Sequence, residues 1–247
     1  MITRLPRLNR SISIAKKDLR IYYGKGPVVI FGILLPFFFF FSFLIGRQMA
    51  PIAVISGLGG MAIWFTATSI SPVIAPWETR TKTLERLVSM PISVTEILLG
   101  DIIASTVMGI SISGFSIVVA ALILDTEFLH PLPFAFSLIL ASFCFSSIGV
   151  LLSALPTDTP ADIMMLATLV KFPVVFISGI FIPLEQLPPW AGTLAHLSPL
   201  TYFVDILRFT FNGTGRPWLD LAVLFLFSLF FTILAVYAHR KTLPKRL

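Results

Sequence analysis

Six long stretches of this sequence contain almost no charged residue, and this feature limits the chain more than any other. The stretches are residues 26–46, 48–77, 102–124, 128–157, 163–184 and 221–238, and only the fifth is interrupted, by Lys171. A helix needs about 20 apolar residues to cross a hydrocarbon layer of about 30 Å. The stretches show no alternation of apolar and polar residues, which excludes a membrane β-barrel. We therefore predict six transmembrane helices, near residues 27–46, 53–75, 100–123, 134–155, 162–183 and 219–238.

The composition is that of a membrane protein. Hydrophobic residues make up 56% of the chain and charged residues only 12%, where about 25% charged is usual for soluble domains. The net charge of +6 does not indicate a nucleic-acid partner, because such a site needs a basic face on an ordered soluble surface, and here the basic residues gather near the two ends. We predict a single all-α domain over residues 1–247, surrounded by the lipid of the cell membrane.

The positions of Lys and Arg predict the orientation of the helices. Seven of these residues precede the first predicted span, three lie between the second and third spans, and four follow the sixth. The loops on the other side hold only Arg47, Arg208 and Arg216. Because short cytoplasmic loops carry an excess of Lys and Arg, we expect both termini in the cytoplasm.

Residues 1–25 have the pattern of an amphipathic helix that lies at the membrane interface. Its predicted apolar face consists of Leu8, Ile12, Ala15, Leu19 and Tyr22. Such a helix either anchors the chain to anionic headgroups or, in addition, contacts a cytoplasmic partner.

A second cytoplasmic segment covers residues 77–98, between the second and third spans. It begins with a short helix that Pro91 ends. The apolar stripe of this helix is Leu84, Leu87 and Val88, and the rest is charged. Ser93 and Glu96 then form a capping box that starts the helix of the third span. The segment is either a solvated connector or a short functional helix.

Residues 184–218 form the longest segment outside the spans on the opposite side of the membrane. Pro188 and Pro189 predict the start of one short helix, and Ser198 followed by Pro199 predicts the start of another. The second helix is predicted to end at Asn212 and Gly213. In the second helix Asp205 and Arg208 are three residues apart and can form an ion pair. One face of this helix is formed by Leu200, Val204, Leu207 and Phe211. Trp190 and Tyr202 fit an aromatic belt, so we expect both helices to lie on or dip into the outer interface.

No motif for catalysis or ATP binding appears in the sequence. A phosphate-binding loop ends in Gly-Lys-Ser/Thr, and the only Gly-Lys pair, Gly24 and Lys25, lacks the rest of this motif. Cys144 is the single cysteine and the three histidines are scattered, which gives no metal-ligand cluster. We predict that the chain is not an enzyme and holds no cofactor or metal.

The predicted membrane interior contains Lys171 but no Asp or Glu. Ion-driven carriers usually keep ionisable residues there, so a self-contained carrier or channel is the alternative that the sequence favours less. A membrane scaffold or integral enzyme is a second alternative. Lys171 lies about 12 Å along the fifth helix, where it either lines a path for an anionic ligand or extends its amine towards the cytoplasmic surface.

Two stretches resemble permease subunits of the type-2 ABC exporter family. Residues 78–100, ETRTKTLERLVSMPISVTEILLG, are similar to the family's cytoplasmic segment after the second span. Residues 178–208, SGIFIPLEQLPPWAGTLAHLSPLTYFVDILR, are similar to its signature through the fifth span and the outer helices. Asp101 departs from the family pattern, which often has a lysine at this place.

The resemblance implies an ATP-driven exporter. Two permease subunits, identical or different, would bind two cytoplasmic ABC ATPase subunits that hold the ATP and Mg²⁺. Residues 78–90 would form a coupling helix that docks on the ATPase, and residues 187–197 and 199–211 would form an extracellular gate. The implied coupling residues are Glu78, Arg80, Leu84, Glu85, Arg86, Leu87 and Val88. The implied substrate-pathway and gate residues are Lys171, Ser178, Gly179, Trp190, Tyr202, Asp205 and Arg208. The sequence does not distinguish between two classes of substrate, an amphipathic or lipid-like molecule and a lipid-linked sugar.

Overall fold

The computed structural model of the chain describes residues 7–24, 26, 30, 34–44, 50–181 and 188–242. All regular structure within these ranges is helical. The helices are α1 (Arg7–Ile21), α2 (Leu35–Leu44), α3 (Pro51–Ala67), α4 (Ser71–Arg80), α5 (Thr83–Ser89), α6 (Val94–Ile123), α7 (Pro131–Leu152), α8 (Pro160–Ile177), α9 (Pro189–Ala195), α10 (Pro199–Asn212) and α11 (Pro217–Thr242).

Five segments of the described chain are long and apolar enough to cross a membrane. They are Pro51–Arg80, which combines α3 and α4, and the four helices α6, α7, α8 and α11. These segments coincide with the second to sixth predicted spans. The first predicted span, residues 27–46, lies partly outside the described residues, which place α2 in its second half.

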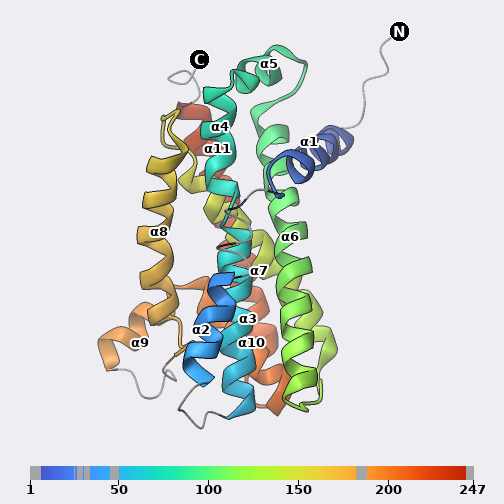
Figure 1. Ribbon diagram of the computed structural model, residues 1–247, viewed down its shortest axis with the longest axis vertical. Coiled ribbons are helices and arrows are strands. Elements are labelled where there is room, and N and C mark those ends of the chain that lie inside the picture. The colour runs from blue at the N-terminus through green and yellow to red at the C-terminus, as the bar shows by residue number, and fades with distance from the viewer. Residues whose placement is uncertain are drawn as a thin grey trace.

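The long helices run side by side along the length of the molecule (Figure 1). One end of this bundle carries α5, α1 and the last turns of α11, and it is called the α5 end below. The other end carries α9 and the start of α11, and it is called the α9 end. The first and last described helices therefore meet at the same end of the bundle.

Helix α3 is the centre of the bundle. Every one of its residues from Val54 to Ala67 is buried, and it packs against α6, α7 and α10. A Cβ atom at Gly59 would lie 2.7 Å from Ile117 of α6 and 2.8 Å from Leu207 of α10. The glycine is required because the helices approach each other so closely here.

The second span is broken between α3 and α4, where a single continuous helix was expected over residues 53–75. The break covers residues 68–70, and Pro72 stands in the first turn of α4. Hydroxyl groups add donors to the backbone carbonyls at the break. Ser71 Oγ donates to the Ala67 carbonyl at 3.0 Å. Thr68 Oγ1 donates at 2.6 Å to the Trp64 carbonyl, which also accepts from the Thr68 backbone amide. Broken helices inside membranes need such substitute donors and acceptors.

The amphipathic helix α1 is present, but its buried face differs from the predicted one. Leu8 is 67% exposed and Ile12 is 37% exposed, although both were expected on the apolar face. The buried face instead includes Ser11, Ile14 and Asp18. This face packs directly on α6, and Ser11 Oγ donates a hydrogen bond to the Glu96 carbonyl at 2.9 Å. Ala15 and Tyr22 are buried as predicted, and Leu19 packs against the apolar cluster that contains them. The buried face is therefore turned from the predicted one only in its first half, where α1 buries a polar residue that finds a partner in the bundle.

Candidate functional site

The segment that joins α4 to α6 contains the residues predicted to couple to a partner. Helix α4 ends at Arg80, Lys82 takes a left-handed conformation with φ of 56°, and α5 follows. The chain then enters α6 through the predicted capping box, in which the Ser93 side chain and the Glu96 carboxylate each accept from the other's backbone amide. Helix α5 is thereby set apart from both long helices as a separate short element.

The apolar face of α5 is buried within this chain. Leu84 and Leu87 are 5% and 6% exposed. Leu87 belongs to a small apolar cluster with Ile14 of α1 and Ile97 of α6. The interpretation of these leucines as contacts to a partner protein does not fit the structure, because both side chains are already buried in the single chain and Leu87 is covered by α1 and α6.

The opposite face of α5 is open. Glu85 and Arg86 are exposed, as are Ser89 and Met90 next to them. Arg80, at the end of α4, is exposed as well, whereas Val88 is half-buried. Of the predicted coupling residues, the charged ones on α5 and Arg80 are therefore the ones that a second protein can reach.

Glu78 is not a surface residue but part of a buried group of charges. Its side chain is 1% exposed and forms an ion pair with Lys17 of α1. Lys17 also lies 3.0 Å from Asp18, whose side chain is fully buried. Burial alone would lower the pKa of Lys17, but the charges of Glu78 and Asp18 outweigh burial and raise it. The ion pairs thus hold α1 against the end of α4.

Asp101 of α6 completes this group of charges, which is called the charge cluster below and consists of Lys17, Asp18, Glu78 and Asp101. Asp101 is 3% exposed, and its carboxyl group interacts electrostatically with that of Asp18. Burial raises the pKa of Asp18. Two carboxylates that are buried close together repel each other when both are ionised.

The charge cluster places two carboxylates within candidate membrane spans, close to the ends of those spans and not in their middle. Glu78 and Asp101 both lie within candidate membrane spans and both are buried. They sit at the α5 end of their helices, where aromatic contacts also fix α1. Tyr22 stacks on Trp77 of α4 with ring centroids 5.5 Å apart, and the Tyr23 hydroxyl bonds to Ser105 of α6. An acid one residue after Gly100, at the start of a predicted span, was the available signal in the sequence.

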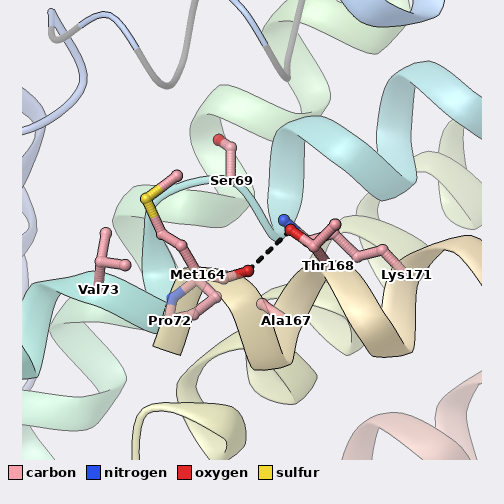
Figure 2. A pocket seen from close by; sticks show the side chains of 7 residues that line it. All are labelled: Ser69, Pro72, Val73, Met164, Ala167, Thr168 and Lys171. Atoms are coloured by element: carbon pink, nitrogen blue, oxygen red, sulfur yellow. Dashed lines mark hydrogen bonds between the residues drawn. The ribbon is translucent and has the colours of Figure 1, made fainter. Parts of the chain in front are cut away.

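Lys171 lies inside the chain, next to the break between α3 and α4. Its side chain is 5% exposed, so the amine does not reach the surface of the chain as one interpretation expected. Figure 2 shows its side chain near those of Ser69 and Pro72 of the break and of Thr168. These residues line a cavity of about 10 Å³. The Lys171 backbone carbonyl accepts a hydrogen bond from Trp64 Nε1 at 3.2 Å. This cavity has no room for a ligand in the single chain, and Lys171 connects α8 to the broken helix.

At the α9 end, the structure brings together four of the predicted gate residues. Gly179 follows the end of α8 in a left-handed conformation with φ of 74°. Gly213, at the end of α10, has a similar φ of 72°. Arg208 of α10 donates to the Gly179 carbonyl at 2.6 Å and lies 3.5 Å from Asp205, which is the predicted ion pair. Ser178 shares a hydrogen bond of 2.8 Å with Ser198. These contacts attach the end of α8 to α10.

The two predicted aromatic gate residues lie apart from this group. The Tyr202 hydroxyl donates to the His196 carbonyl at 2.9 Å and so holds the end of α9. Trp190 of α9 is 68% exposed. An exposed indole at this end agrees with the expected aromatic belt.

Helix α10 has the predicted bounds to within one residue, but it is a core helix rather than an interfacial one. Leu200, Val204 and Leu207 are fully buried, and Phe211 is 6% exposed. The helix packs on α3, α7 and α11. The apolar stripe of α10 therefore packs against the bundle. The periodicity of the sequence predicts an apolar face, but it does not distinguish contact with other helices from contact with lipid.

The apolar helices, their burial at the centre and the exposed apolar surface around them define a multi-pass membrane protein. The sequence matches the ABC-2 type transporter family over residues 12–212. This match covers most of the chain, and the chain belongs to that family of transport permeases.

Three curated relatives illustrate the likeness. The inner membrane transport permease YadH of Escherichia coli K12 is 29% identical over 133 residues, which cover 53% of this chain and 51% of the relative. Nodulation protein J of Rhizobium leguminosarum bv. trifolii is 32% identical over 122 residues, or 46% of this chain and 45% of the relative. The inner membrane transport permease YhhJ of Escherichia coli K12 is 28% identical over 198 residues, or 77% of this chain and 51% of the relative. The chain spans about half the length of the curated relatives it matches.

Proposed function

We propose that this chain is the membrane-spanning subunit of an ATP-driven exporter. In this proposal it pairs with a second permease subunit, identical or different, and two separate cytoplasmic ATPase subunits bind at the α5 end. The observation that carries the proposal is the two-sided character of α5. One face is fixed to α1 and α6 through Leu87, and the other presents Glu85 and Arg86 to solvent.

A helix arranged in this way is suited to transmit force. A partner that pushes on the exposed face of α5 also displaces α1 and the first turns of α6, because Leu87 is packed between them. The charge cluster extends the same connection to α4 through Lys17 and Glu78. Movement of a partner would thus reach the spans as a displacement of packed helices.

The second permease subunit would lie against α8. Met165, Leu169 and Phe176 share one face of this helix and are 76%, 71% and 54% exposed. Residues at these spacings project from the same side, and they form an apolar strip along the span. Lys171 projects from a different side, towards the break between α3 and α4, so we assign it to positioning that break and not to the surface between two subunits.

The experiment that tests the proposal is recovery of an ATPase with the tagged chain. The chain is purified in mild detergent from its native membrane, and the eluate is assayed for an ATP-hydrolysing subunit. Reversing both exposed charges, with Glu85→Arg and Arg86→Glu together, is expected to lower ATPase recovery at least fivefold. The matched control is Glu127→Arg, which changes an exposed carboxylate at the α9 end.

Equal recovery of the ATPase with both variants would contradict the role of α5. Transport by the purified chain in liposomes without any ATPase would instead favour the self-contained carrier. Replacing Leu84 or Leu87 does not test the contact, because those side chains are buried and their loss disturbs the permease itself.

A further inference from the structure

A groove of about 1000 Å³ lies at the α5 end, on the side where α1 and the last turns of α11 flank α6. Its polar end is formed by Thr95 of α6 and by two arginines, Arg10 of α1 and Arg240 of α11. Its floor is apolar and consists of Leu99 and Ile103 of α6 with Phe143 of α7. The volume is at the upper end of the range usual for ligand sites, about 300–1,000 Å³.

The groove has a direction relative to the membrane. Thr95, Leu99 and Ile103 are four residues apart and share one face of α6. Ile103 therefore lies about 12 Å further along the span than Thr95. On the same face the next position, Val107, is 44% exposed. The apolar floor thus continues onto the outer surface of the span, in the region that lipid chains occupy.

The two arginines make the polar end positive. Arg240 donates to Thr95 Oγ1 at 3.0 Å, and Arg10 donates to the Pro91 carbonyl at 2.5 Å. Each guanidinium has five N–H donors, so these bonds leave donors for an anion. Among the residues that the structure describes, Glu96 is the one carboxylate that lines the groove, and it lies 3.7 Å from Arg10 and is bound to Ser93 in the capping box. The two arginines outnumber the one carboxylate, which is already bound in the capping box, so the polar end of the groove favours a negatively charged ligand.

We propose that this groove binds one anionic phospholipid from the membrane leaflet at the α5 end. Its phosphate lies between Arg10 and Arg240, and an acyl chain follows Leu99, Ile103 and Phe143 towards the middle of the membrane. A small water-soluble anion would gain nothing from the apolar floor, and in a zwitterionic lipid the choline cation would offset the phosphate charge beside the two guanidinium groups. The bound lipid joins α1 to α11, two helices at opposite ends of the chain.

The test compares lipids and charges in the full chain. The purified chain is stripped of lipid in mild detergent, phosphatidylglycerol or phosphatidylcholine is added back at equal concentration, and native mass spectrometry counts the lipid retained. We expect one phosphatidylglycerol per chain and at least fivefold weaker retention of phosphatidylcholine. Arg240→Gln is expected to weaken phosphatidylglycerol binding at least fivefold. The matched control Lys241→Gln removes the same charge from the next residue of α11, which is exposed and outside the groove, and is expected to bind like the original chain.

Equal losses in Arg240→Gln and Lys241→Gln would overturn the proposal, since diffuse attraction would then explain the binding. Equal retention of the two lipids, or no loss in Arg240→Gln, would overturn it as well. Release of the lipid when an ATPase binds would show that the groove belongs to a protein interface. A second variant, Ile103→Trp, fills the floor without changing charge and is expected to lower retention, while its thermal midpoint without lipid shows that the chain is folded.

Discussion

The two ends of the bundle are held together by different forces. At the α5 end, ion pairs in buried surroundings connect α1 to α4, with Lys17 between Glu78 and Asp18. At the α9 end, the contacts between α8 and α10 are hydrogen bonds to backbone and hydroxyl groups, such as those of Arg208 and Ser178. Charges buried at one end make that end sensitive to protonation and to the loss of one partner. At the other end the ion pair of Arg208 and Asp205 is partly exposed, and the Gly179 carbonyl that Arg208 binds does not titrate.

The largest effect is expected for Lys17→Met at the α5 end. The change leaves Glu78 and Asp18 buried without their cation, and breaking a buried ion pair costs about 3–5 kcal/mol. The free energy of unfolding, measured by thermal or chemical denaturation in mild detergent, should fall by that amount. Lys16→Met is the control, because the neighbouring Lys16 is exposed, and its effect should stay within about 0.5 kcal/mol. Equal effects of the two changes would show that the ion pairs contribute little.

The next largest effect is expected for Gly100→Ala, which acts on the same end through packing. A Cβ atom at Gly100 would lie 2.6 Å from the Ile14 side chain and 2.9 Å from the Ser11 carbonyl oxygen. Overpacking of this kind costs about 1–3 kcal/mol. Limited proteolysis should therefore cut α1 faster in this variant. Gly114→Ala on the same helix is the control, because its nearest neighbour, Leu138, is at 3.2 Å and can shift. Unchanged proteolysis would contradict the close contact.

A smaller effect is expected at the α9 end for Arg208→Met. The change removes the donor to the Gly179 carbonyl together with the partly exposed ion pair to Asp205, and it should lower the free energy of unfolding by about 1–2 kcal/mol. The loss should be the same at pH 5 and pH 8, because the carbonyl does not titrate. Arg216→Met, which alters an exposed arginine at the same end, is the control. A loss that depended on pH would remove the distinction between the two ends.

The smallest effect is expected for Asp18→Asn, and it is a stabilisation at high pH. Burial raises the pKa of Asp18, so the folded chain binds a proton which the unfolded chain releases. The contribution of this group to stability is then highest at low pH and falls as the pH rises from about 4 through the raised pKa. Replacing the buried carboxyl group should restore about 1 kcal/mol at pH 8 and reduce this slope. Denaturation curves at pH 5 and pH 8 measure both quantities, and an unchanged slope would exclude Asp18 as its source.

Local signals predicted helix boundaries well. Ser198, Pro199 and Gly213 place α10 to within one residue, and the capping box of Ser93 and Glu96 starts α6 as expected. Each of these signals acts within a few residues, through caps and turns that form in the same way in any surroundings. Boundaries of this kind can therefore be read from the sequence.

The partners of buried side chains could not be predicted in the same way. The leucine stripe of α5 looks the same whether it faces its own chain or another protein, and only the fold shows that Leu87 meets Ile14. Lys17 and Glu78 are 61 residues apart in the sequence, so no local sequence pattern predicts their ion pair. The break near Ser69 had a signal in the hydroxyl residues that precede Pro72, but the high hydropathy of the span concealed it.

The contact at Gly100 also determines how motion in this protein can be observed. Without a side chain at this position, the backbone of α6 touches α1 directly, and no flexible layer separates the two helices. Lys16 projects into solvent from the opposite side of α1. A spectroscopic label attached at Lys16 would therefore move together with the first turns of α6. It would report on the motion of a membrane-spanning helix from a position outside the membrane.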